Sequence, residues 1–79
     1  MTAPQLTPTL AAVGEALAEL ERAERLSPPM RSAHEGLAIV EEEFLEFRNE
    51  VFWGTPEKAR EECIQVVAMG LRFLKDITP

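Results

Sequence analysis

Five glutamates crowd the stretch VEEEFLEFRNEVFWG at residues 40–54, where they alternate with large apolar side chains. Like charges three or four residues apart on a helix repel one another and destabilise it. Their carboxylates also converge on one side of the helix, and carboxylate oxygens are ligands that Mg²⁺ prefers. The crowding therefore indicates either a solvent-exposed acidic face or a site for a divalent cation.

The spacing of the acids selects candidate metal ligands. Glu43 and Glu46 are three residues apart, and Glu46 and Glu50 are four apart, so their carboxylates reach a common point above a helix. Two carboxylates of one helix do not complete a Mg²⁺ site, so a second helix must contribute. The next predicted helix offers Glu62 and Gln65, again three residues apart.

Proline and glycine divide the chain into three predicted helices. The pair Thr7–Pro8 is a start signal, because a capping hydroxyl is followed by a proline whose missing N–H costs nothing at the first helical position. Residues 1–6 lack periodicity and are predicted to form a flexible tail. The predicted helices cover about residues 8–26, 32–53 and 56–77.

Apolar spacing predicts how these helices pack. The second helix carries a narrow stripe at spacings of three and four: Leu37, Val40, Phe44, Phe47 and Val51. The apolar residues of the third helix cover more than one stripe, so this helix is expected to pack on two sides, the second most naturally being another subunit. The sequence thus predicts an all-α, antiparallel helical bundle of about three helices per chain, completed by oligomerisation as a homodimer or homotetramer.

Composition narrows the class of protein. The chain has 79 residues, enough for one small domain, and its single cysteine excludes an internal disulfide. The net charge of −6 and the absence of a basic run argue against nucleic-acid binding. No segment has the apolar length of a membrane span or the pattern of a signal peptide. We therefore expect a soluble, cytoplasmic protein.

The two acidic motifs together resemble those of a known family. E-E-x-x-E at residues 42–46, followed on the next helix by E-x-x-Q at 62–65, is similar to the E-E-x-x-E and E-x-x-D signature of MazG-like all-α nucleoside triphosphate pyrophosphohydrolases. The resemblance to the small phage and bacterial members extends over residues 32–77. It implies Mg²⁺ (or Mn²⁺) as cofactor, a nucleoside triphosphate as substrate, and hydrolysis to the monophosphate and pyrophosphate.

The resemblance also assigns roles to individual acids. Glu43 and Glu46 match the first pair of metal ligands, with Glu42 as a supporting or water-positioning acid. Glu62 matches the first position of E-x-x-D. The family aspartate falls on Gln65, which offers a neutral amide oxygen in place of a carboxylate, so the site loses one negative charge.

The remaining site predictions concern the nucleotide. Glu42 or Glu50 is expected to position the attacking water. Arg72 and Lys75, on the polar side of the third helix, are the candidates for phosphate contact. Trp53 is a candidate for stacking on the base, against the alternative that it closes the end of the bundle.

Two functions follow from this pattern. One is an enzyme that hydrolyses nucleoside triphosphates with magnesium. The other is a catalytically degenerate relative, a helical oligomer that binds a nucleotide, a metal or a protein partner without hydrolysis. The substitution at Gln65 favours the second function, and the complete E-E-x-x-E motif favours the first.

Overall fold

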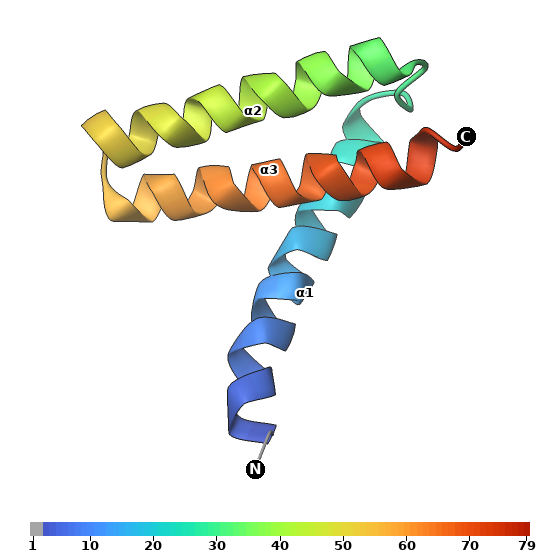
Figure 1. The fold of residues 1–79 in the computed structure, drawn as a ribbon. Helices are drawn as coiled ribbons and strands as arrows, with labels where there is room; N and C mark the ends of the chain where they lie inside the picture. The colour runs from blue at the N-terminus through green and yellow to red at the C-terminus, as the bar shows by residue number, and fades with distance from the viewer. Residues whose placement is uncertain (1–2) are drawn as a thin grey trace.

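The computed structural model describes residues 3–79, with side chains from Thr7 onward, and these residues form three α-helices and no strand. The helices are α1 (Ala3–Leu26), α2 (Ala33–Trp53) and α3 (Pro56–Asp76). Figure 1 shows α2 and α3 side by side as an antiparallel hairpin, with α1 crossing α3 at a steep angle. The prediction of an all-α chain with three helices is confirmed. None of the described helices is both long and apolar enough to cross a membrane.

Helices α2 and α3 begin within one residue of their predicted starts, and a side chain caps each of them. The hydroxyl of Ser32 accepts from the N–H of Glu35 at 3.1 Å, and that of Thr55 accepts from the N–H of Lys58 at 3.1 Å. Glu35 in turn accepts from the backbone N–H of Arg31 at 2.8 Å, one residue earlier than a standard capping box. These contacts fix the backbone where the chain enters α2 and where it enters α3.

The predicted start of the first helix is wrong. Helix α1 begins at Ala3, so Pro8 lies inside it, and the predicted tail is helical over residues 3–6. Residues 1–2 lie outside the described residues. A proline near the free end of a helix removes only one backbone hydrogen bond, and the alanine-rich segment that follows has high helix propensity. The Thr7–Pro8 pair therefore does not mark the start of the helix.

The core is small and lies where α1 crosses α3. Its buried apolar side chains are Ala16, Leu20, Met30, Ala68 and Met69. Partly buried apolar residues of α2 and α3 pack around this cluster. Among the described residues no large apolar side chain is completely buried, so a single chain obtains limited stabilisation from its interior.

Helix α3 packs on two sides, as predicted, but both neighbours belong to the same chain. It contacts α2 along the hairpin and α1 at the crossing, whereas the described parts of α1 and α2 do not pack against each other. The two sides of α3 are thus occupied by helices of its own chain, where the sequence analysis expected another subunit on the second side. Only part of the α2 stripe faces α3: Val40 and Phe47 are half-buried, and Leu37, Phe44 and Val51 are exposed.

A buried arginine holds the loop between α1 and α2. Arg72 is 4% exposed and donates to the hydroxyl and carbonyl oxygens of Ser27 at 2.9 and 2.8 Å and to the carbonyl oxygen of Pro28 at 2.8 Å. Its guanidinium lies 3.3 Å from Asp76, whose carboxylate accepts from the N–H of Met30 at 3.0 Å. This hydrogen bond lowers the pKa of Asp76, and the positive charges of Lys75 and Arg72 lower it further by smaller amounts. The end of α3 thereby fixes the path of the chain from α1 into α2.

Candidate metal centre

Three glutamates of α2 converge: Glu43 and Glu46, as the sequence predicts, and Glu42 in place of the predicted Glu50. Glu42, Glu43 and Glu46 each present a carboxylate oxygen, and these oxygens lie within 4.8 Å of one another. The convergence follows from helix geometry, because Glu46 is one turn beyond both Glu42 and Glu43. Glu42 was predicted to position water, but its carboxylate lies in the same cluster as the two predicted metal ligands, Glu43 and Glu46.

Helix α3 adds a fourth carboxylate to this cluster. Glu62 lies beside Glu46, and the pKa of Glu62 is raised first by burial and then by the neighbouring Glu46 and Glu50. Its Oε2 atom is inaccessible to solvent and has no hydrogen-bond partner. An unpaired buried carboxylate oxygen is costly, so this atom is suited to a ligand that carries positive charge.

The negative charge of the cluster is poorly compensated. Burial is the largest cause of a raised pKa at Glu43, followed by the charges of Glu46, Glu62, Glu42 and Glu19. Within the described part of the chain, no lysine or arginine forms an ion pair with any of the three clustered α2 glutamates. The site therefore favours either a proton or a bound cation.

Glu50 and Trp53 extend the acidic side of α2 towards the hairpin turn. Glu50 is half-buried, and its carboxylate folds over Gly54 while its charge still acts on Glu62. Trp53 is 84% exposed, so it does not close the end of the bundle within this chain. It follows Glu46 by seven residues, which places it on the same side of α2 about 10 Å further along the axis.

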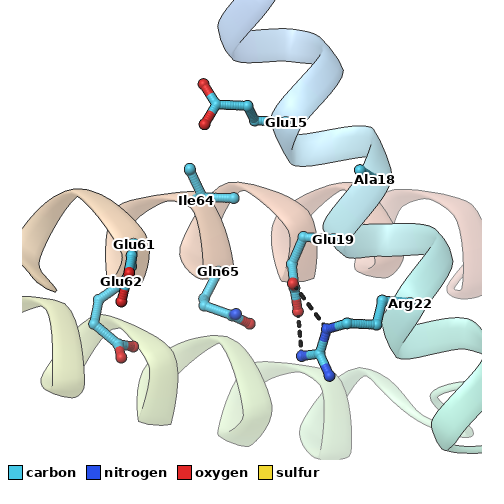
Figure 2. Close-up of a pocket in the computed structure, with 8 residues that line it drawn as sticks. All are labelled: Glu15, Ala18, Glu19, Arg22, Glu61, Glu62, Ile64 and Gln65. Atoms are coloured by element: carbon cyan, nitrogen blue, oxygen red, sulfur yellow. Dashed lines mark hydrogen bonds and ion pairs between the residues drawn. The ribbon is translucent and has the colours of Figure 1, made fainter. Parts of the chain in front are cut away.

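Gln65 lies in a groove between α1 and α3. The groove has a volume of about 490 Å³ and is lined by Glu62 and Gln65 of α3 and by Glu19 and Arg22 of α1, among others. Figure 2 shows Gln65 between the side chain of Glu62 and the Glu19–Arg22 pair. The groove thus continues from the acidic cluster to a helix that the sequence did not connect with it.

Glu19 and Arg22 are the residues of this site that sequence reasoning missed. Arg22 donates to both carboxylate oxygens of Glu19, at 3.0 and 2.6 Å. This contact is the main cause of a lowered pKa at Glu19, to which the side chain of Gln65 also contributes. In the sequence the two residues are an ordinary surface pair three apart, and nothing in their spacing indicates that α1 crosses α3 beside Gln65.

The two predicted phosphate contacts lie elsewhere. Arg72 is committed to the loop between α1 and α2, and its buried guanidinium is not available to a phosphate near the acidic cluster. Lys75 pairs with Glu24 at 2.6 Å and follows Gln65 by ten residues, about 15 Å along α3. Lys75 is exposed, as expected for the polar side of α3, whereas Arg72 is buried because the loop after α1 covers it.

Comparisons with protein-family models, with curated proteins and with solved structures find no match for this chain. The resemblance to MazG-like pyrophosphohydrolases therefore rests on the two acidic motifs and their order.

Proposed function

We propose that the protein hydrolyses a nucleoside triphosphate to its monophosphate and pyrophosphate, with Mg²⁺ or Mn²⁺ held by Glu43, Glu46 and Glu62. The observation that carries this proposal is the convergence of carboxylates from α2 and α3 without a basic partner for the three α2 acids. Structural acids on a helix surface are usually paired or dispersed in solvent, whereas metal-binding acids must be close together when the cation is absent.

The residues present fit a hard divalent cation. All the donors are carboxylate or amide oxygens, and the unpaired Oε2 of Glu62 is already withdrawn from water. The pKa values of Glu43 and Glu62 are raised in the protein alone, which is the expected state of ligands that lack their cation. When bound, the cation would supply neutralisation of the phosphate charge and of the leaving pyrophosphate.

The other roles fall to side chains around the cluster. Glu42 or Glu50 accepts a proton from the attacking water and orients it. Gln65 donates or accepts through its amide next to the ligands, and Trp53 stacks on the base at the open end of the acidic side. Arg22 contacts the phosphates, because it is a basic side chain that lines the same groove as Glu62.

Pyrophosphate release from a panel of nucleoside triphosphates, with Mg²⁺ or Mn²⁺, tests the proposal. Turnover is expected in the wild type and is lost with a chelator. Glu46→Ala and Glu62→Ala should each reduce turnover by at least about a hundredfold while helix content is unchanged. Glu21→Ala, which removes an exposed acid of α1, serves as the control and should retain full turnover. Equal turnover in all these variants would exclude the assigned ligands.

A second candidate is a helical module that binds the metal or nucleotide without hydrolysis. The observation that favours it is the neutral Gln65 at the position of the family aspartate, beside Glu62 in the groove. Such a module would show a metal-dependent rise in melting temperature that depends on Glu46 and Glu62, with no pyrophosphate released. Metal binding and turnover thus separate the two functions.

A further inference from the structure

Glu19 of α1 lies beside the acidic cluster, although it belongs to a different helix. Its side chain is only 14% exposed. Burial is the largest cause of the raised pKa of Glu43 on α2, and the charge of Glu19 adds to it. Figure 2 shows the end groups of Glu62, Gln65 and Glu19 in a row along the groove between α1 and α3. A carboxylate of α1 therefore stands at one end of the candidate metal centre.

Gln65 supplies no charge in the middle of this row. Its amide is neutral, whereas a cation held by oxygen ligands gains affinity from each nearby carboxylate. On one side of it, Oε2 of Glu62 is inaccessible to solvent and has no hydrogen-bond partner. On the other side lies the carboxylate of Glu19. Glu19 is thus placed to supply the negative charge that Gln65 lacks.

Arg22 occupies the carboxylate of Glu19 in this structure. The guanidinium donates to both carboxylate oxygens, at 3.0 and 2.6 Å, so one charged group engages the whole carboxylate. A guanidinium and a metal ion repel each other, because both are positively charged. Arg22 and a cation therefore compete for Glu19.

The contact between Arg22 and Glu19 can be exchanged at low cost. The side chain of Arg22 is 52% exposed, and exposed ion pairs within one helix contribute little to stability. Phosphate oxygens accept from a guanidinium with the same two-point geometry as a carboxylate. A phosphate in the groove can therefore take Arg22 from Glu19.

A second ion pair of the groove has a different role. Glu15 lies one turn before Glu19 and accepts from Arg60 at 2.8 and 2.6 Å, so this pair joins α1 to α3. Figure 2 shows Glu15 pointing away from Gln65. The pair of Glu19 and Arg22 lies within α1 and holds no two helices together. Attachment of α1 therefore does not account for it.

We propose that Glu19 and Arg22 exchange partners when substrate binds: Arg22 moves to the phosphates, and the freed carboxylate of Glu19 joins Glu62 in binding the cation. The inference rests on the proposed function, because it adds a ligand and a coupling to the same site. A polyphosphate that carries a divalent cation satisfies both residues, whereas a cation or a phosphate alone satisfies one. Binding of the cation and of the phosphate is therefore cooperative.

Binding of Mn²⁺ alone, followed by the EPR signal of the free ion, tests the exchange without turnover. Glu19→Gln should weaken binding by about tenfold, because a ligand carboxylate is lost. Arg22→Met should strengthen it by about threefold, because Glu19 is released. A purely structural ion pair predicts equal effects, since each variant removes the same contact. Opposite signs support the exchange, and effects of one sign, or none, overturn it.

Two matched controls separate the exchange from general electrostatics. Glu15→Gln removes an acid of the same groove, and Arg25→Met removes an exposed basic residue of α1. Both should bind Mn²⁺ like the wild type, and circular dichroism should show the same helix content in all four variants. A control that changes binding as much as its matched variant would overturn the assignment.

Inorganic pyrophosphate in the presence of Mg²⁺ tests the movement of Arg22. Arg22→Met should weaken pyrophosphate binding by about tenfold in titration calorimetry, although the same variant binds the cation more tightly. Arg22→Lys keeps the positive charge and should recover part of this affinity. Pyrophosphate binding that is unchanged in Arg22→Met would contradict the exchange.

The behaviour of the wild type distinguishes this inference from the proposed function. Binding of Mn²⁺ that is lost in Glu46→Ala but unchanged in Glu19→Gln would refute the exchange and leave the metal centre in place. A wild type that binds no Mn²⁺ would refute both.

Discussion

The carboxylate of Glu43 is surrounded by like charge and is partly buried, and both effects raise its pKa. Its carboxyl group therefore loses its proton at a lower pH in the unfolded chain than in the folded one. Above the folded pKa, the charged group lowers the stability of the metal-free protein, and this cost disappears as the pH falls through that pKa.

Glu43→Gln should accordingly stabilise the metal-free protein at pH 7 by about 0.5 kcal/mol, since it removes repulsion with glutamates one turn away. The gain should shrink towards pH 4, and the rise in melting temperature on adding Mg²⁺ should be reduced. Urea unfolding over this pH range measures the first effect. Glu21→Gln is the control. A loss of stability at pH 7 would mean that the Glu43 carboxylate makes favourable contacts that the cluster geometry does not indicate.

Gln65 is the residue at which enzyme and binding module diverge. Restoring a carboxylate with Gln65→Asp adds a negative charge beside Glu62, so Mg²⁺ affinity should rise by about tenfold. In a weakened enzyme turnover should rise with it. Titration calorimetry with Mg²⁺ and the pyrophosphate assay measure the two effects separately. If affinity rises while turnover stays absent, the protein is a binding module, and unchanged affinity would place Gln65 outside the metal site.

At the residue scale, the sequence predicted that Glu43 and Glu46 come together, but it did not predict the surroundings of the basic residues. Glu43 and Glu46 are brought together by one helix turn, which is a local property of the sequence. Arg22 and Arg72 depend on where α1 and its loop cross α3, and that crossing is set by burial of small side chains such as Ala16 and Ala68. Such contacts leave no periodic signal in the sequence.

Among the elements, the loop between α1 and α2 depends most on a single side chain. Arg72→Met keeps a side chain of similar length but leaves the Ser27 and Pro28 oxygens without their donor and removes one of the basic neighbours of Asp76. We expect a loss of about 2–4 kcal/mol of unfolding free energy, measured by urea denaturation. Lys75→Met, which removes an exposed ion pair with Glu24, should cost less than about 1 kcal/mol. Similar losses in both variants would contradict the role assigned to Arg72.

The glycines of α1 and α2 give a second comparison between elements. Gly14→Ala should stabilise the protein by about 1 kcal/mol, because an added Cβ meets nothing within 4 Å and alanine favours the helix. Gly36→Ala should destabilise it by about 1–3 kcal/mol, because the Cβ would overlap the ring of Phe73 where α2 meets α3. Thermal unfolding of the two variants under one buffer condition checks the opposite signs. A stabilising Gly36→Ala would mean that Phe73 moves freely.

Helix boundaries were predictable wherever side chains cap the backbone. Ser32 and Thr55 mark the starts of α2 and α3 because their hydroxyl groups satisfy N–H groups that the helix itself cannot pair. The start of α1 was predicted wrongly at Pro8, because proline is tolerated both at the first position of a helix and a few residues inside its N-terminal end. The α2 stripe predicted a seam of five residues, yet a single neighbour covers only Val40 and Phe47 of that set.

For the whole molecule, the oligomerisation that the sequence predicts should make the melting temperature depend on protein concentration. Binding that favours the folded state stabilises it by mass action, so the melting temperature of the wild type should rise by several degrees over about a hundredfold increase in protein concentration. Differential scanning calorimetry provides the measurement. A wild-type value independent of concentration would agree with a monomer and contradict the predicted oligomer.

The attachment of α1 also has a consequence for the order in which the molecule forms and opens. Only two residues separate α2 from α3, so the hairpin closes through short loops, whereas the contacts of Arg72 with Ser27 join residues 45 positions apart. Within the described residues, α1 packs on α3 and on no other helix, so it can detach without separating the hairpin. We expect its amides to exchange with solvent through a lower-energy opening than those of α3. Each such opening carries Glu19 and Arg22 away from the groove while the acidic cluster of the hairpin stays assembled. Under the proposed function, detachment of α1 would then be a path by which the nucleotide leaves.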